Sequence, residues 1–288
     1  WVRQHGTRAE PELVAIAGPD SLVLRGARFE PEDHSHRARV TVAAGDVHDT
    51  VLTWHPSHRE PPRRLDVAAA LDHTRTWWTD WADRIDVRDV HRAEVVRSLL
   101  ILRALTHRDT GGIIAAATTS LPEQFGGERN WDYRFVWLRD AALTLEALVA
   151  HGFLQAADHW RSWLLRAIAG DPSQMQIVYG IGGERDLLER ELDSLPGYRG
   201  SAPVRIGNGA FDQRQHDIWG TMLDSVYLHT KSREQIPETL WPVLKEQVEE
   251  AIKHWKEPDR GIWEVRGEPQ HFTSSKIMCW VALDRGAK

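Results

Sequence analysis

The hydrophobic pattern of this chain changes its period once, and that change limits the folds open to it. Before residue 58 the apolar residues form short runs at 13–17, 22–24 and 51–54, or alternate with polar ones, as Ala38, Val40 and Val42 do. Both arrangements are typical of β-strands. A polar connector with two prolines follows at 58–64, and beyond it apolar residues recur with a period of 3.6, as in amphipathic helices. The sequence therefore predicts a β part followed by an α part.

The α part is expected to hold a linking helix and a series of longer ones. The predicted helices cover residues 71–81, 95–105, 137–149, 153–168, 218–227, 236–255 and 277–283, and the second has an apolar face wide enough to be largely buried. Three long loops separate them, at 108–134, 170–207 and 257–272. Such long loops are uncommon in a compact helical domain and usually carry function. We expect the helices to be scaffold and the loops to build the site.

Charge and composition exclude several classes of protein. Lys and Arg total 36 and Asp and Glu total 42, a net charge of −6, so no basic surface for nucleic acid is expected. Nothing resembles a membrane span of about 18 apolar residues or a signal peptide. With a single cysteine, Cys279, this favours a cytoplasmic protein. Fourteen tryptophans, against four tyrosines and six phenylalanines, supply flat surfaces suited to stacking on sugar rings.

The loop that leads into residue 137 carries the first candidate residues. Arg139 and Asp140 are adjacent at a predicted helix start, preceded by Trp131 and Trp137. Their side chains point about 100° apart, so they are not an i,i+4 ion pair. An Arg and an Asp placed in this way can donate to and accept from two hydroxyls of one ligand. The alternative is a solvated ion pair beside two core tryptophans.

The third loop carries a candidate acid, Glu264, directly after Trp263. A carboxyl beside a large aromatic side chain loses solvation, which raises its pKa toward the range that a general acid needs. The alternative is an exposed loop glutamate. Glycines at 180–183 lack the strand and helix of a dinucleotide site, and no ligand spacing predicts a metal. Glu189 and Arg266 are also in these loops, and the sequence assigns them no role.

Four stretches, at 51–58, 130–140, 203–210 and 261–267, resemble glycoside hydrolase family 15, which contains glucoamylases, glucodextranases and bacterial trehalases, and are most similar to its trehalase-like members. The resemblance covers essentially the whole chain. It implies a β super-sandwich followed by an (α/α)6 barrel, which agrees with the change in period. The domains implied are a sandwich at 1–68, a linker helix at 69–88 and half of the barrel at 89–288.

The resemblance also implies roles for individual residues. Glu264 matches the general acid, and Arg139 and Asp140 match the pair that binds the hydroxyls of the terminal glucose. The full set of expected substrate-binding residues is Trp131, Trp137, Arg139, Asp140, Arg205, Asn208 and Trp263. Gly261 and Val265 stand where fungal glucoamylases have carboxylates, which favours a different leaving group, such as the second glucose of trehalose.

The family inverts configuration and so needs a second carboxylate as general base. The pattern after the linker holds about six helices where a complete barrel has twelve, so we expect the chain to be truncated and the base to lie beyond Lys288. The expected function is an inverting exo-acting trehalase, although this stretch alone is expected to be inactive. The alternatives are a glucoamylase or glucodextranase, a disaccharide phosphorylase, and a non-catalytic glucan-binding module. The sequence calls for no cofactor. A phosphate or Mg²⁺ ion enters by resemblance alone, and a homo-oligomer stays open.

Overall fold

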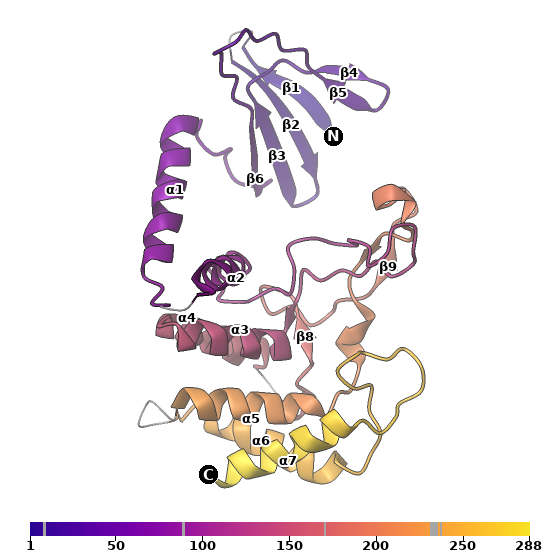
Figure 1. The fold of residues 1–288 in the computed structure, drawn as a ribbon. Coiled ribbons are helices and arrows are strands. Elements are labelled where there is room, and N and C mark those ends of the chain that lie inside the picture. The colour runs from indigo at the N-terminus through magenta and orange to yellow at the C-terminus, as the bar shows by residue number, and fades with distance from the viewer. Residues whose placement is uncertain (8–9, 88–89, 170, 231–235, 237) are drawn as a thin grey trace. The chain divides into compact units, whose positions relative to one another are not determined.

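The computed structural model combines a small sheet with a set of helices. It describes residues 1–7, 10–87, 90–169, 171–230, 236 and 238–288. The chain divides into two compact units, Trp1–Trp81 and Ala82–Lys288. Among the described residues, no helix has both the length and the apolar character needed to cross a membrane. The predicted order of a β part and then an α part is confirmed (Figure 1).

The first unit is built on a four-stranded antiparallel sheet in the order β1-β2-β3-β6. Its strands are β1 (Val2–Gly6), β2 (Pro11–Ala17), β3 (Asp20–Arg25) and β6 (Val51–Pro56). The predicted runs at 13–17, 22–24 and 51–54 all lie in these strands. Leu13 faces Leu24 in the β2–β3 register, and the side chain of Val23 is fully buried. A small hairpin of β4 (Glu30–Glu32) and β5 (Ser35–Arg37) interrupts the connection to β6.

One predicted strand is wrong. Residues 38–42 form no strand, and Val40 and Val42 are 44% and 55% exposed. No strand of the described residues pairs with this segment. Alternation predicts a strand only where a neighbouring strand satisfies the backbone groups and covers one face, and both are missing here. The helix predicted at 71–81 is confirmed as α1 (Val67–Asp83), and it includes the boundary between the two units.

The second unit holds the remaining helices. They are α2 (Arg92–Ala104), α3 (Leu138–Ala150), α4 (Leu154–Ala167), α5 (Asp217–Thr230), α6 (Trp241–His254) and α7 (Thr273–Ala287). Figure 1 shows α5, α6 and α7, in orange and yellow, packed side by side, and α3 contacts α5. At Gly220 a Cβ would lie 2.1 Å from the Met278 carbonyl oxygen, so glycine permits the close approach of α5 and α7.

Two helix predictions need correction. The apolar face of α2 is not largely buried, because Leu99 is its one buried residue among the described side chains. Among the described elements α2 packs mainly against α3, and such a contact covers only a narrow stripe of its surface. The helix predicted from residue 236 begins at Trp241, with Pro242 in its first turn, because proline is tolerated there but breaks a helix interior. Residue 237 lies outside the described part.

The long loops contain short ordered pieces. These are β7 (Val136–Trp137), β8 (Val178–Tyr179), β9 (Arg190–Glu191), β10 (Arg205–Ile206) and the 3-10 turns η1 (Pro172–Gln174), η2 (Tyr198–Gly200) and η3 (Gly209–Asp212). β7 pairs with β8, and β9 with β10. The first pairing joins the start of α3 to the second long loop, and the second pairing holds two segments of that loop together.

Candidate active site

Arg139 and Asp140 lie in the first turn of α3. Trp137 ends the short strand β7 in an extended conformation, and the helix begins at the next residue. The Arg139 guanidinium is held from three sides. Its Nη1 donates to Asp217 Oδ2 at 2.8 Å and to Gln215 Oε1 at 3.1 Å, and its Nη2 donates to the Ile262 carbonyl at 3.3 Å. Arg139 is therefore fixed by its neighbours and not a mobile surface charge.

Glu264 reaches this place from the third long loop. Its backbone has φ of +53°, a left-handed conformation uncommon for a side-chain-bearing residue, and its N–H donates to the Gly261 carbonyl at 3.1 Å. The resulting turn brings the carboxyl to Trp137 and Arg139. Trp137 Nε1 donates to Glu264 Oε1 at 2.5 Å, and Arg139 Nη2 lies 3.9 Å from the same oxygen. The predicted acid and the predicted glucose-binding arginine are thus neighbours.

The surroundings raise the pKa of two carboxyl groups, those of Glu264 and Asp140. For Glu264 the main cause is burial, since its side chain is 22% exposed. The hydrogen bond from Trp137 and the charge of Arg139 oppose this rise, and the charge of Asp140 adds to it. Asp140 remains accessible to solvent, but the protein around it also raises its pKa by partial burial, against the charge of Arg139. A proton held on Glu264 at higher pH is what a general acid requires.

The aromatic partner of Glu264 is not the one that the sequence suggested. Trp263 is 82% exposed, so it covers little of the neighbouring carboxyl. Trp137, which lies 127 residues earlier, is 3% exposed and donates the hydrogen bond. Consecutive side chains on a tight turn point in different directions, so adjacency in sequence does not bring them together here. The interpretation that Trp263 desolvates the acid is wrong, whereas its role toward substrate stays a prediction.

Trp131, Arg205 and Asn208 lie on a neighbouring part of the same unit. The guanidinium carbons of Arg205 and Arg266 lie 4.7 and 4.1 Å from the ring centroid of Trp131. Asn208 is buried, and it donates to the Asp132 carbonyl at 3.1 Å and accepts from the Ala210 N–H at 2.9 Å. These bonds use the Asn208 amide to hold a turn. Contact of these three residues with sugar stays a prediction.

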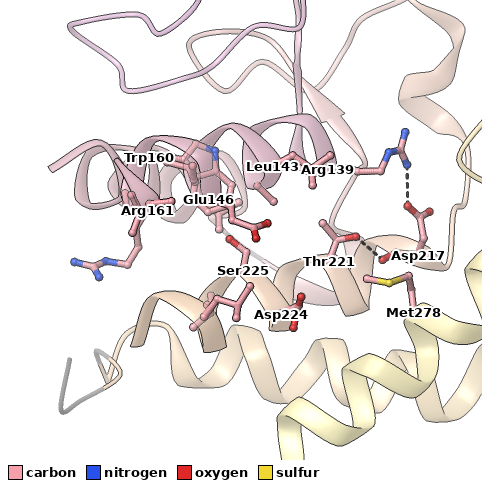
Figure 2. Close-up of a pocket in the computed structure, with 18 of the residues that line it drawn as sticks. Arg139, Leu143, Glu146, Trp160, Arg161, Asp217, Thr221, Asp224, Ser225 and Met278 are labelled. Atoms are coloured by element: carbon pink, nitrogen blue, oxygen red, sulfur yellow. Dashed lines mark hydrogen bonds and ion pairs between the residues drawn. The ribbon is translucent and has the colours of Figure 1, made fainter. Parts of the chain in front are cut away.

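A cavity of about 470 Å³ opens next to Arg139, between α3, α4 and α5. Figure 2 shows Arg139 and Asp217 at one end of the cavity and Arg161 at the other. Its wall is mainly apolar, with Leu143 and Trp160 among the residues that line it. Glu264 is not among the residues that line this cavity, whereas Arg139 lines it and lies 3.9 Å from the Glu264 carboxyl. Within the described ranges, no group of three or more His, Cys, Asp or Glu side chains could hold a metal ion.

Sequence reasoning missed Gln215 and Asp217, which hold Arg139. Asp217 is 1% exposed and starts α5, and Gln215 is as deeply buried two residues earlier. No local pattern distinguishes them from other polar residues before an apolar helix. The residues just before α5 are polar, although α5 itself is buried over most of its first two turns, and this combination is unusual. That feature could have marked them as partners of another buried charge.

The chain is similar in sequence to trehalases of two mycobacteria. A trehalase of Mycolicibacterium smegmatis is 56% identical over 282 residues, which cover 95% of this chain and 42% of that protein. A trehalase of Mycobacterium tuberculosis is 52% identical, over 94% of this chain and 40% of its own length. The chain thus spans about two fifths of the curated relatives that it matches.

The fold has a solved counterpart. The crystal structure of a bacterial glucoamylase complexed with acarbose aligns with a TM-score of 0.62 at 13% identity, over 96% of this chain and 45% of that one. The family model of glycosyl hydrolases family 15 matches residues 89–288, which include Arg139, Asp140 and Glu264. On this match, and on two relatives with more than half of their aligned residues identical, the chain belongs to glycosyl hydrolases family 15.

Proposed function

We propose that this chain carries the acid and the glucose-binding residues of an inverting, exo-acting α-glucoside hydrolase whose substrate is trehalose. The observation that carries the proposal is the position of Glu264 Oε1, 2.5 Å from Trp137 Nε1 and 3.9 Å from Arg139 Nη2. A carboxyl with a raised pKa, beside a fixed guanidinium, suits protonation of a glycosidic oxygen. The curated trehalases at 56% and 52% identity support the choice of trehalose.

The proposed reaction breaks the bond between C1 of the terminal glucose and the glycosidic oxygen. Glu264 gives its proton to that oxygen as positive charge develops at C1. A water molecule attacks C1 from the opposite face and loses its proton to a second carboxylate. Arg139 and Asp140 hold hydroxyls of the terminal glucose, and this binding energy orients the bond that breaks.

The proposal assigns the second carboxylate to the part of the protein outside this chain. In inverting enzymes the two carboxyls lie roughly 6.5–9.5 Å apart, with the attacking water between them. Asp217, the buried carboxylate next to Arg139, is committed to that guanidinium at 2.8 Å. The matched trehalases are more than twice as long as the region they share with this chain, which supports a base supplied elsewhere.

The finer fold assignment is also a proposal. We propose that residues 1–68 belong to a β super-sandwich, residues 69–88 to a linker and residues 89–288 to half of an (α/α)6 barrel. The support is the run of α-helices from α2 to α7 and the alignment with 45% of a bacterial glucoamylase. We further propose a cytoplasmic location, which the free and buried thiol of Cys279 supports.

A substrate panel with the full-length protein tests the function. We expect trehalose to be hydrolysed faster than maltose, isomaltose or dextran, with one β-glucose released per bond broken, as inversion requires. E264Q is expected to lower kcat on trehalose by roughly 10²- to 10⁴-fold, the usual contribution of a general acid. E268Q, in an exposed position of the same loop, is the control and should retain kcat. Unchanged kcat in E264Q would remove Glu264 from the proposed role.

A glucoamylase-type activity is the second candidate, because the structural similarity is to a bacterial glucoamylase. It makes the opposite prediction in the same panel. Maltose or dextran would then be hydrolysed faster than trehalose, again with release of β-glucose. The loss in E264Q would be the same, so the substrate order and not the mutant separates the two candidates.

A further inference from the structure

Arg266 belongs to a charged cluster that the proposed mechanism does not use. Its guanidinium carbon lies 4.1 Å from the ring centroid of Trp131. The Glu189 carboxylate fixes it in a two-point pair, with Nη1 at 2.9 Å and Nη2 at 2.7 Å. Glu189 in turn accepts from the Gly209 N–H at 3.1 Å, which ties the pair to the backbone. Paired hydrogen bonds of this kind fix both the position and the plane of a guanidinium.

Arg205, the second arginine that packs against the Trp131 ring, is held by several neighbours. Arg205 donates to the Glu128 carbonyl at 2.8 Å and to Glu191 Oε1 at 3.2 Å, its Nε lies 3.6 Å from Glu189, and its side chain is 12% exposed. Arg266 is 49% exposed. Its pair with Glu189 uses one N–H of each terminal nitrogen, and its remaining N–H groups have no partner among the residues that the structure describes. Within the described structure both guanidiniums keep unused N–H groups, and those of Arg266 belong to the side chain that is exposed to solvent.

Arg266 also lies within electrostatic reach of the acid. It follows Glu264 by two residues on the same turn. The bond to Glu189 is the main cause of its raised pKa, and the charges of Glu264 and Tyr133 contribute to the rise. Tyr133 packs against Trp137 with ring centroids 5.8 Å apart, next to the proposed acid. Arg266, Tyr133 and Glu264 thus lie close enough to influence one another's charge, and the free donors of Arg266 are near the proposed acid.

We infer that Arg266, held by Glu189 against Trp131, binds hydroxyls of the leaving sugar and so is a specificity-determining residue for the group released. The inference rests on the proposed function. A planar guanidinium presents paired N–H donors that match two neighbouring oxygens. The cluster sets two guanidiniums against the carboxylates of Glu189 and Glu191, and so has no net charge. It suits a neutral sugar and not a sugar phosphate.

Two substrates with the same glucose and different leaving groups test the inference in the full-length protein. Trehalose releases a sugar, whereas α-glucosyl fluoride releases an ion that has no hydroxyls. R266M should lower kcat/KM on trehalose by roughly 10- to 100-fold, the range for hydrogen bonds to a charged group. The same variant should change kcat/KM on α-glucosyl fluoride by less than about twofold. R190M, the same substitution at an exposed position of β9, should change neither.

Every other outcome of this experiment contradicts either the inference about Arg266 or the proposed function. Equal losses on both substrates, or none, would show that Arg266 does not contact the leaving sugar, while the parent enzyme stays an active hydrolase. If a disaccharide with 6-phosphate on its leaving glucose is preferred and loses most in R266M, the ligand is an anion and the neutral-sugar inference is wrong. If the parent protein hydrolyses neither trehalose nor α-glucosyl fluoride, the proposed function itself fails.

Discussion

Two glutamates of the second unit are held in opposite ways. Glu264 accepts a hydrogen bond from Trp137 and lies 3.9 Å from the Arg139 guanidinium, and burial outweighs the lowering effects of Trp137, Arg139 and Gln215, so its pKa is raised. Glu189 accepts two N–H groups of Arg266 and one backbone N–H, and the bond to Arg266 dominates, so its pKa is lowered. Burial with few partners prepares a proton donor, and saturation with donors prepares a fixed anion.

Replacing each glutamate by glutamine gives the strongest test of this difference between Glu264 and Glu189. E264Q removes the proposed proton donor, so kcat on trehalose should fall by roughly 10²- to 10⁴-fold with a small change in KM. E189Q keeps the shape of the anchor but loses its charge, so Arg266 is held less firmly and KM should rise by about tenfold with kcat largely kept. Steady-state kinetics of both variants measures the split. A kcat loss in E189Q as large as that in E264Q would break the distinction.

A buried histidine extends the contrast from activity to stability. His216 is fully buried and stacks on Trp219, with ring centroids 4.8 Å apart. Neither of its ring nitrogens has a hydrogen-bond partner among the described residues. Burial lowers its pKa from 6.5 to about 4, against the charge of Asp259. Asp132, by contrast, is equally buried but pairs with Arg134 through two bonds of 2.9 and 2.8 Å.

The sign of the His216 effect follows from the depressed pKa. Below pH 6.5 the unfolded chain binds a proton that the folded chain refuses down to about pH 4. The free energy of unfolding should therefore fall by about 3 kcal/mol across this window, and level off below it. In H216F the ring still stacks on Trp219 and nothing titrates, so this part of the fall should vanish.

Urea unfolding midpoints between pH 7 and pH 4 measure the difference between the parent protein and H216F. H159Q, at an exposed position of α4, is the matched control and should keep the slope of the parent. If H216F retains the full slope, carboxylates elsewhere in the chain account for the acid sensitivity. The proposed cost of burying His216 without partners would then be wrong.

The elements of this fold were predictable where a local period coincides with real neighbours. The strands β2, β3 and β6 and the helices α3, α4, α5 and α7 all lie where periodicity places them. The prediction failed at 38–42, where alternation meets no partner strand among the described residues, and at α2, whose apolar face is left largely uncovered in the described structure. In both cases the hydrophobic pattern is present, but no neighbouring element that the structure describes covers most of the apolar face. Hydrophobic periodicity gives no information on whether such an element exists.

The candidate site shows the same limit at the level of single residues. Arg139, Asp140 and Glu264 come from the family motifs, which preserve contacts made across more than a hundred residues. Adjacency in the sequence indicated the wrong aromatic partner, Trp263, because the tryptophan that contacts the Glu264 carboxyl is Trp137. The partners of Arg139 and the clamp between Glu189 and Arg266 join separate loops, and no spacing in the sequence joins those loops. The sequence predicted the candidate residues but not the neighbours that hold them.

The smallest expected effect distinguishes Trp137, which donates a hydrogen bond to Glu264, from Trp263, which precedes Glu264 in the sequence. Trp137 donates to the carboxylate form of Glu264 and so lowers its pKa against the effect of burial. W137F removes that donor, so the pKa of Glu264 should rise further, and kcat should fall off at a higher pH than in the parent because the acid must stay protonated. Trp263 is exposed and makes no such bond, so W263F should leave the pH of this fall unchanged. The pH dependence of kcat on trehalose measures both. If W137F instead admits water, the fall moves to lower pH, and solvent exclusion by the ring, not its hydrogen bond, would be the main contribution of Trp137.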